Sequence, residues 1–233
     1  MNTPANAPLP IVERLTQWLA APPPESRPWV TLSYAQSLDA CLTLARGSPT
    51  AISGAESLRL THAARAAHTA ILIGVGTLLA DNPRLTARIP NAMQPQPVIL
   101  DSTLRTPINA HVLQHPLGAW IITTPAAPEA RATALQARGA HIVRVNANAQ
   151  GQVNLPEALA HLRSTSIASV MVEGGAQILS ALLTHRLADF ALITIAPLLL
   201  GGLPALQLPA ARRPLHTVHW QPCGQDMVLL SRL

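Results

Sequence analysis

The stretch from Ser169 to Ala176 reads S-V-M-V-E-G-G-A. A short apolar run ends in an acid, Glu173, and two glycines separate it from an apolar segment with helical spacing. This order predicts a strand, a tight turn and a helix. Glycines at such a turn let the backbone approach a ligand closely, and the first N–H groups of the helix can bind an anion. The alternative is a turn that needs glycine for two positive φ angles and binds nothing.

The same alternation of strands and helices continues on both sides of this stretch. Strands are expected at 29–35, 70–74, 97–101, 119–123, 141–145, 190–197 and 227–231, and helices at 11–20, 53–67, 128–137, 156–163 and 176–184. This pattern predicts an α/β fold with a mostly parallel mixed sheet. No helix is evident between the last two strands, so we expect antiparallel C-terminal strands. Residues 1–27 are interpreted as an N-terminal helical appendage with a Pro-rich linker, and residues 28–233 as the main domain.

Two details of this pattern concern the ends of its elements, one of a helix and one of a strand. The helix expected at 53–67 begins with Ser53-Gly-Ala-Glu56, which matches the capping-box pattern. Glu173 would lie at the carboxyl end of its strand, where α/β sheets bind their ligands.

The composition is that of a globular chain: 233 residues, 48% hydrophobic and 12% charged. It contains no uninterrupted run of about 18 apolar residues, so no membrane span is expected. The start, Met1 to Pro10, has no basic segment and predicts no signal peptide. Two cysteines, Cys41 and Cys223, make neither a disulfide framework nor a metal cluster. We therefore expect a cytoplasmic protein without a metal site.

The formal net charge is +5, and all of the basic residues counted in it are arginines, because the chain has no lysine. Its arginines are scattered singly apart from Arg212 and Arg213. Proteins that bind nucleic acid usually gather their positive charge in a patch, so this class is not favoured. Dispersed arginines suit a few sites for phosphate or carboxylate, or they keep an apolar surface soluble.

Gly74-Val-Gly76-Thr77 follows an expected strand and resembles half of a dinucleotide-binding fingerprint. The third glycine is missing, so the segment is either a phosphate cradle of backbone N–H groups and a threonine hydroxyl, or a plain turn. Two arginines near it, Arg65 and Arg88, are either solvated or converge on one phosphate. Asp39, after the strand at 29–35, is either a site acid or an ordinary turn residue.

Taken together, several segments resemble the riboflavin-biosynthesis reductases, which form the reductase half of a bacterial bifunctional deaminase-reductase and also occur as stand-alone enzymes. The segments that carry the resemblance are T-L-S-Y-A-Q-S-L-D ending at Asp39, I-S-G ending at Gly54, L-I-G-V-G-T-L-L-A-D-N-P-R-L-T-A-R ending at Arg88, I-L-D-S ending at Ser102, V-E-G-G ending at Gly175 and I-A-P-L-L-L-G-G ending at Gly202. Their order and spacing match over about residues 28–231, and the joint match is far more specific than any one motif.

The resemblance implies a dihydrofolate-reductase-like three-layer α/β/α fold, a homodimer, and NADPH as hydride donor. The implied reaction reduces the ribosyl group of a 5-phosphoribosylamino-pyrimidine to ribityl. Residues that would line NADPH are Ala35, Thr77, Asp81, Ser102, Gly174, Gly175, Ala176, Gln177, Ile178 and Leu179. Residues that would meet the substrate are Arg65, Leu85, Arg88 and Glu173.

Glu173 is also the main candidate for a catalytic residue, through bonds to the sugar hydroxyls, and Asp39 is a second one. Two other functions stay open on the sequence alone. One is a dihydrofolate-reductase-like enzyme acting on a pterin or another substrate, and the other is a catalytically silent NADPH-binding protein.

Overall fold

The computed structural model describes residues 10–48 and 50–233. Residues 1–9, which belong to the predicted appendage and to the segment examined for a signal peptide, lie outside this part. Within it, nine strands form one sheet in the order β10-β11-β8-β1-β7-β3-β4-β5-β6. These strands are β1 (Trp29–Ser37), β3 (Ala70–Gly74), β4 (Gln96–Leu100), β5 (Ala119–Thr123), β6 (Ala140–Arg144), β7 (Ser169–Val172), β8 (Phe190–Ala196), β10 (His216–Cys223) and β11 (Asp226–Arg232).

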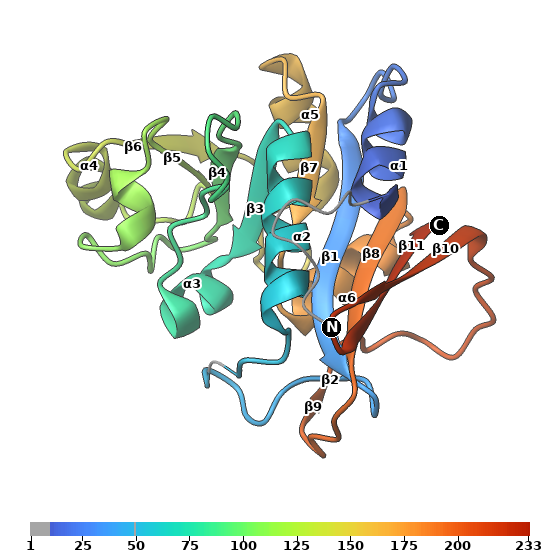
Figure 1. Ribbon diagram of the computed structural model, residues 1–233. Helices are drawn as coiled ribbons and strands as arrows, with labels where there is room; N and C mark the ends of the chain where they lie inside the picture. Colours follow the sequence, from blue (N-terminus) through green and yellow to red (C-terminus); the bar gives the residue numbers. More distant parts are fainter. Residues whose placement is uncertain (1–9, 49) are drawn as a thin grey trace.

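The sheet is parallel from β8 through β6, and β11 and β10 add to it in antiparallel fashion. Two short strands, β2 (Cys41–Thr43) and β9 (Leu203–Pro204), pair separately and form an arm at the foot of the molecule in Figure 1. The predicted mixed sheet with antiparallel C-terminal strands is therefore confirmed.

Helices cover both faces of the sheet, as Figure 1 shows. They are α1 (Pro10–Leu19), α2 (Ala55–Ala67), α3 (Val75–Asp81), α4 (Glu129–Gln136), α5 (Leu155–Ser164) and α6 (Ala176–Thr184), with a short 3-10 turn η1 (His111–Gln114). Alternate residues of the central strands point to opposite faces. On β3, Leu72 belongs to the cluster under α5 and α6, whereas Ile71 and Ile73 belong to the cluster under α3 and α4. The predicted three-layer α/β/α architecture is confirmed.

The start of α2 differs from its prediction. The capping box at Ser53 is wrong, because α2 begins at Ala55 and its N-cap is Gly54, which makes no side-chain cap hydrogen bond. The Gly54 N–H donates instead to the Asp226 carboxylate of β11 at 2.9 Å. The helix start is thus bound by a residue of a distant strand and not by a neighbouring side chain, and a local sequence pattern cannot reveal a partner of that kind.

His68, at the end of α2, is buried between this helix and β1. Its Nδ1 lies 2.7 Å from the Ala64 carbonyl and its Nε2 lies 2.8 Å from the Thr31 hydroxyl. Because a carbonyl only accepts, Nδ1 carries a proton, and in the neutral ring Nε2 accepts from the Thr31 hydroxyl. Burial lowers the pKa of His68 from 6.5 to about 4.

We expect this buried ring to make the fold acid-sensitive. The folded-state pKa lies below the unfolded one, so the stability that the neutral ring contributes is present above pH 6.5 and is lost as the pH falls towards about 4. At 1.36 kcal/mol per pKa unit the loss is on the order of 3 kcal/mol. When the free energy of unfolding is measured with urea across this pH range, it should vary less with pH in His68→Gln than in the wild type. The exposed-site control His141→Gln should follow the wild type. Parallel profiles for His68→Gln and wild type would refute this.

Candidate active site

Two helices begin at glycines beside one another, at the carboxyl ends of the neighbouring strands β3 and β7. Gly74 is the N-cap of α3 with φ −87°, and Gly175 is the N-cap of α6 with φ −69°. Neither glycine has a positive φ, and neither does Gly174. A Cβ on Gly74 would lie 2.5 Å from Ile178 Cδ1, and one on Gly174 would lie 3.1 Å from Ile178 Cβ. Close packing against Ile178, and not a left-handed backbone, therefore favours glycine at these two positions.

The space in front of these two helix starts is open and offers hydrogen-bond donors. A Cβ on Gly76 would meet nothing within 4 Å, and one on Gly175 would meet only the Thr77 hydroxyl, at 3.6 Å. The backbone N–H groups of Ala176 and Gln177 have no partner within the described chain. Two helix N-termini, free N–H groups and a threonine hydroxyl make a surface that suits a phosphate or diphosphate.

Glu173, directly after β7, forms a two-point ion pair with Arg65 of α2. Arg65 Nε donates to Oε1 at 2.7 Å and Nη2 donates to Oε2 at 2.6 Å. Arg65 Nη1 donates to the carbonyl of Thr86 at 3.0 Å. The two side chains are only 13% and 18% exposed, so this is a largely desolvated pair with fork geometry. It joins three parts of the chain at one point: α2, the end of β7 and the segment after α3.

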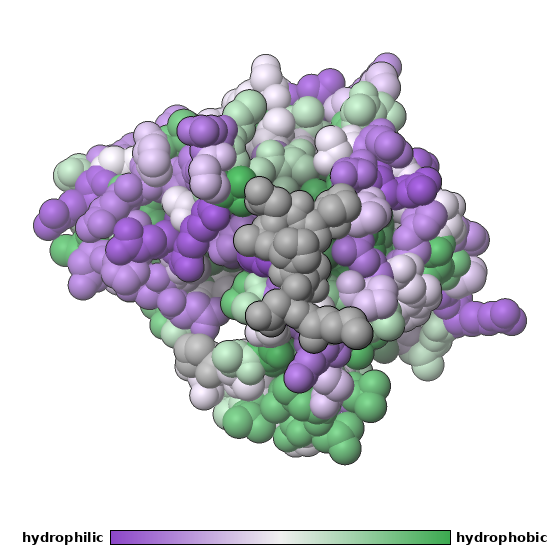
Figure 2. Space-filling view, in the orientation of Figure 1, coloured by the Kyte–Doolittle hydropathy of each residue, from purple (hydrophilic) through white to green (hydrophobic). Residues whose placement is uncertain are grey.

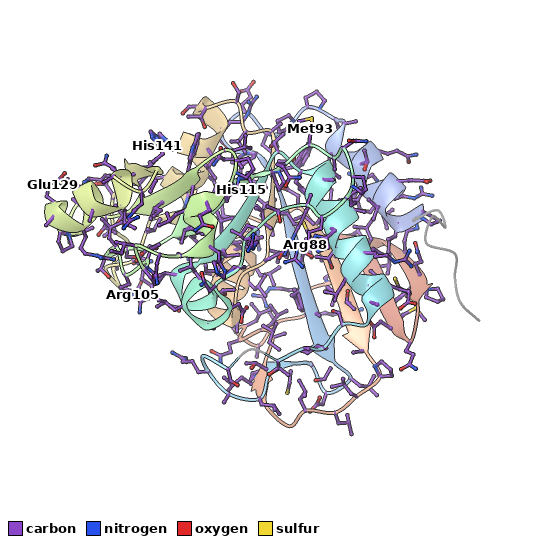
Figure 3. The ribbon with its side chains drawn as sticks, turned by 60° about the vertical axis from the view of Figure 1, so that its left-hand side comes forward. Arg88, Met93, Arg105, His115, Glu129 and His141 are labelled. Carbon is purple, nitrogen blue, oxygen red and sulfur yellow. The ribbon has the colours of Figure 1, made fainter. Side chains whose placement is uncertain are left out.

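That segment, residues 82–88, presents Arg88 beside α2 (Figure 3). The Arg88 backbone N–H donates to His62 Nδ1 at 3.3 Å. Its exposed guanidinium has no hydrogen bond or ion pair within the described residues. Burial, followed by the charges of Arg65 and Arg88, lowers the pKa of His62. His62 and the two arginines thus make the surface beside Glu173 rich in cationic and hydrogen-bonding groups.

Four adjacent parallel strands, β1, β7, β3 and β4, carry most of the remaining predicted residues at or near their carboxyl ends. Ala35 is half-buried on β1, and Ser102 follows β4 and accepts a hydrogen bond from the Val153 N–H at 3.0 Å. Asp81 is exposed at the last position of α3. Ala35 and Ser102 thus lie at the same edge of the sheet as Glu173, and the cofactor contacts of these residues and of Asp81 stay predictions.

Two predicted contact residues have fully buried side chains. Leu85 has a positive φ of 55° and is 1% exposed, and it packs in the core under α3 and α4. Leu179 is 0% exposed and packs in the core under α5 and α6. Because these values cover the whole residue, backbone included, neither offers surface to a ligand in this structure, and their predicted ligand contacts stay predictions.

Asp39 lies beyond the end of β1, in the turn that leads to the β2–β9 arm. Its carboxylate accepts from the Ser37 hydroxyl, from the Leu200 N–H at 3.0 Å and from the Gly201 N–H at 2.7 Å. The Ser37 bond, followed by the two backbone bonds, lowers the pKa of Asp39. Asp39 thus fastens the 197–201 loop to the end of β1, and its catalytic role stays a prediction.

His62 is a site residue that sequence reasoning missed. It lies three residues before Arg65, so both side chains project from the same side of α2. The three-residue spacing between His62 and Arg65 is the sequence signal that would have identified His62.

Other kinds of site are not evident in the part of the chain that the structure describes. No group of three or more His, Cys, Asp or Glu side chains is placed to hold a metal ion there. None of the helices in residues 10–48 and 50–233 combines the length and apolar character that crossing a bilayer needs.

Comparison with known proteins agrees with this geometry. Residues 28–229 match the model of the RibD C-terminal domain family. The chain is 36% identical, over 96% of each chain, to a protein of Eremothecium gossypii named 2,5-diamino-6-ribosylamino-4(3H)-pyrimidinone 5′-phosphate reductase. A protein of the same name from Methanothermobacter thermautotrophicus is 36% identical over 78% of this chain and 83% of its own length.

Among solved structures, the riboflavin biosynthesis reductase Rib7 of Saccharomyces cerevisiae is similar along nearly its whole length. It superimposes with a TM-score of 0.78 at 27% identity and covers 96% of this chain and 98% of its own. With the family match over most of the chain, these likenesses confirm the resemblance found in the sequence. The protein belongs to the RibD C-terminal domain family of riboflavin-biosynthesis reductases.

Proposed function

We propose that this protein is a reductase that converts the ribosyl group of 2,5-diamino-6-ribosylamino-4(3H)-pyrimidinone 5′-phosphate to ribityl. The observation that carries the proposal is the position of Glu173. Along the chain it directly precedes the open helix start of α6, and through Arg65 it contacts the segment that bears Arg88. A donor-rich cradle and a pair of arginines therefore flank one carboxylate, which suits a cofactor and a phosphorylated sugar meeting at that point. The whole-length likeness to reductases of that name supports the same substrate.

The cofactor cradle would be formed by the starts of α3 and α6. Thr77 and the turn from Gly174 to Gln177 offer a hydroxyl and backbone N–H groups to its phosphates. Ala35, Asp81 and Ser102, with Ile178, would line the rest. A nicotinamide cofactor bound there supplies the hydride.

NADPH is the form of the cofactor that we propose, because of the turn after β4. Asp101 is fully buried, and its carboxylate accepts from the Arg105 N–H, the Thr106 N–H and the Thr106 hydroxyl at 2.9, 2.7 and 2.8 Å. It is therefore not available to hold a ribose 2′-hydroxyl, as the acid of an NAD site would be. The exposed guanidinium of Arg105 has no partner within the described residues and suits a 2′-phosphate instead.

We expect NADPH to bind more tightly than NADH, and Arg105→Gln to remove much of the difference. One charge-assisted contact of about 1.5–3 kcal/mol corresponds to roughly a 10- to 100-fold loss for NADPH, with NADH little changed. Fluorescence titration of both cofactors against both proteins measures this. Equal affinity of the wild type for the two cofactors would contradict the assignment.

The substrate would lie on the other side of Glu173. Arg88 would bind its 5′-phosphate. Both oxygens of Glu173 keep a free acceptor site after binding Arg65, so the carboxylate can accept from the sugar hydroxyls. Binding the phosphate far from C1′ would align that carbon with the hydride donor. Asp39 remains a more distant candidate for a catalytic role.

The test of the function is NADPH oxidation with a small panel of compounds. The panel contains the diaminopyrimidinone phosphate, its deaminated counterpart, a pterin and dihydrofolate. The proposal expects the first compound to react best and its product to carry a ribityl chain by mass spectrometry. A preference for dihydrofolate or the pterin, or binding of NADPH without any reduction, would refute it.

We propose that the reductase domain begins at residue 28, after the N-terminal segment 1–27. We also propose that the protein is a homodimer. The arm of β2 and β9 carries exposed large apolar side chains, Leu38, Leu44, Leu199 and Leu203. Figure 2 shows a hydrophobic surface at the foot of the molecule, where Figure 1 places this arm. A contiguous apolar surface of this kind marks a contact with another protein surface. Light scattering at micromolar concentration that gives the monomer mass would contradict the dimer.

A further inference from the structure

The turn after β4, residues 101–106, carries Arg105, whose guanidinium the proposed function assigns to the 2′-phosphate of NADPH (Figure 3). Asp101 is fully buried and binds the N–H groups of Arg105 and Thr106 and the Thr106 hydroxyl. The two neighbours of Arg105, Leu104 and Thr106, are 1% and 0% exposed. The chain on either side of Arg105 is therefore buried in the protein, whereas Arg105 itself is exposed.

Arg131 of α4 binds the same turn through its carbonyl groups. Its Nε donates to the Leu104 carbonyl at 3.0 Å, and its Nη2 donates to the Thr106 carbonyl at 2.5 Å. One guanidinium thus bridges the two residues that flank Arg105. Arg131 forms no ion pair within residues 10–48 and 50–233, so its contacts there serve the turn.

The conformation of Leu104 explains why this turn has to be held. Its φ is +56°, in the left-handed region that residues with a Cβ rarely adopt. Such a conformation costs energy and persists only where the surrounding structure determines it. The carbonyl of a buried residue also needs a donor, because an unpaired one is costly. Arg131 supplies that donor to Leu104 and, through Thr106, fixes the chain on both sides of Arg105.

We infer that Arg131 is a positioning residue for the preference for NADPH over NADH, and that it acts through the backbone of Arg105. The inference rests on the proposed function, because it needs the 2′-phosphate to meet Arg105. A side chain whose backbone is already fixed loses less conformational freedom when it binds. Arg131 therefore strengthens binding of the 2′-phosphate without contacting it, and it contributes nothing to the binding of NADH, which lacks that group.

The test measures the dissociation constants of NADPH and NADH by fluorescence titration for the wild type, Arg131→Met and Arg131→Lys. Arg131→Met removes both hydrogen bonds to the turn and should bind NADPH roughly 10-fold more weakly, with NADH nearly unchanged. Arg131→Lys keeps the charge but not the planar fork, so it should recover only part of the loss. Arg138→Met is the matched control, because Arg138 is an exposed arginine just after α4, and this variant should bind both cofactors as the wild type does.

A double variant separates positioning from direct contact with the phosphate. If Arg131 acts through Arg105, adding Arg131→Met to Arg105→Gln should cost little further affinity for NADPH. Two independent contacts would instead give losses that multiply. Losses that multiply, full recovery by lysine, or equal losses for NADPH and NADH would each overturn the inference.

Two further measurements concern the protein without cofactor. Urea unfolding shows whether each variant is folded, and Arg131→Lys carries the same comparison if Arg131→Met is not. Amide hydrogen exchange at Arg105 and Thr106 should be faster in Arg131→Met, and unchanged rates would count against the inference. Equal binding of NADPH and NADH by the wild type would refute the proposed cofactor and, with it, this inference. A preference for NADPH that survives intact in Arg131→Met would overturn the inference alone.

Discussion

Replacing Arg88 by alanine is expected to lower kcat/KM for the phosphorylated pyrimidine by about 100-fold or more. A guanidinium can bind a phosphate through two charge-assisted hydrogen bonds, each contributing about 1.5–3 kcal/mol. Reaction of the unphosphorylated riboside should hardly change, and neither should NADPH affinity. kcat should fall together with a rise in KM, because binding energy at the phosphate is used to orient the reacting carbon. Steady-state kinetics on the two substrates measures both effects.

Arg84→Ala is the matched control for this variant. Arg84 is an exposed arginine of the same segment, four residues before Arg88. Its removal changes the charge by the same amount and should leave both reactions within a factor of about 2–3, as surface substitutions usually do. The fold should tolerate Arg88→Ala equally well, because the guanidinium binds nothing within the described residues. Equal losses on the two substrates would show that Arg88 does not recognise the phosphate.

Sequence pattern predicted the main sheet well because its central strands are buried on both faces. Val170, Met171 and Val172 are all 0% exposed, so β7 is a continuous apolar run that stands out from its surroundings. The edge strand β10 was not predicted: most of its residues are exposed and Pro222 interrupts it, so it has no regular alternation. Its pairing with β11 exists only in the tertiary structure. The short strands β2 and β9 were not predicted either, because they too are recognisable only from their pairing in the tertiary structure.

The candidate site could be predicted as a set of residues but not as a set of contacts. The motifs placed Glu173 and the glycine turns at one edge of the sheet, where the structure has them. The ion pair of Glu173 with Arg65 joins positions 108 residues apart, which no local pattern relates. The reason for glycine at positions 74 and 174 was also hidden, since it is the packing of Ile178 and not the backbone angle.

Gly76 offers a decisive test of the cofactor cradle. We expect Gly76→Leu to weaken NADPH binding by roughly 100-fold or more, because the new side chain would fill the space that the cofactor needs. Gly76 is the second residue of α3, has no positive φ, and a Cβ there would meet nothing within 4 Å. Leucine is the better helix former by about 0.5–1 kcal/mol, so the fold should be unharmed or slightly more stable. Fluorescence titration with NADPH and urea unfolding measure the two effects.

Ala130→Leu is the matched control, because Ala130 is the exposed second residue of another helix, α4. Figure 1 places α4 at the far side of the sheet from the start of α6. The control should bind NADPH as the wild type does. Gly76→Ala should fall between wild type and Gly76→Leu, because one methyl group fills only part of the space. Unchanged NADPH affinity in Gly76→Leu, with the protein folded, would mean that the cofactor does not pass the start of α3. The open space at Gly76 would then need another occupant, since packing within the described chain gives no reason for a glycine there.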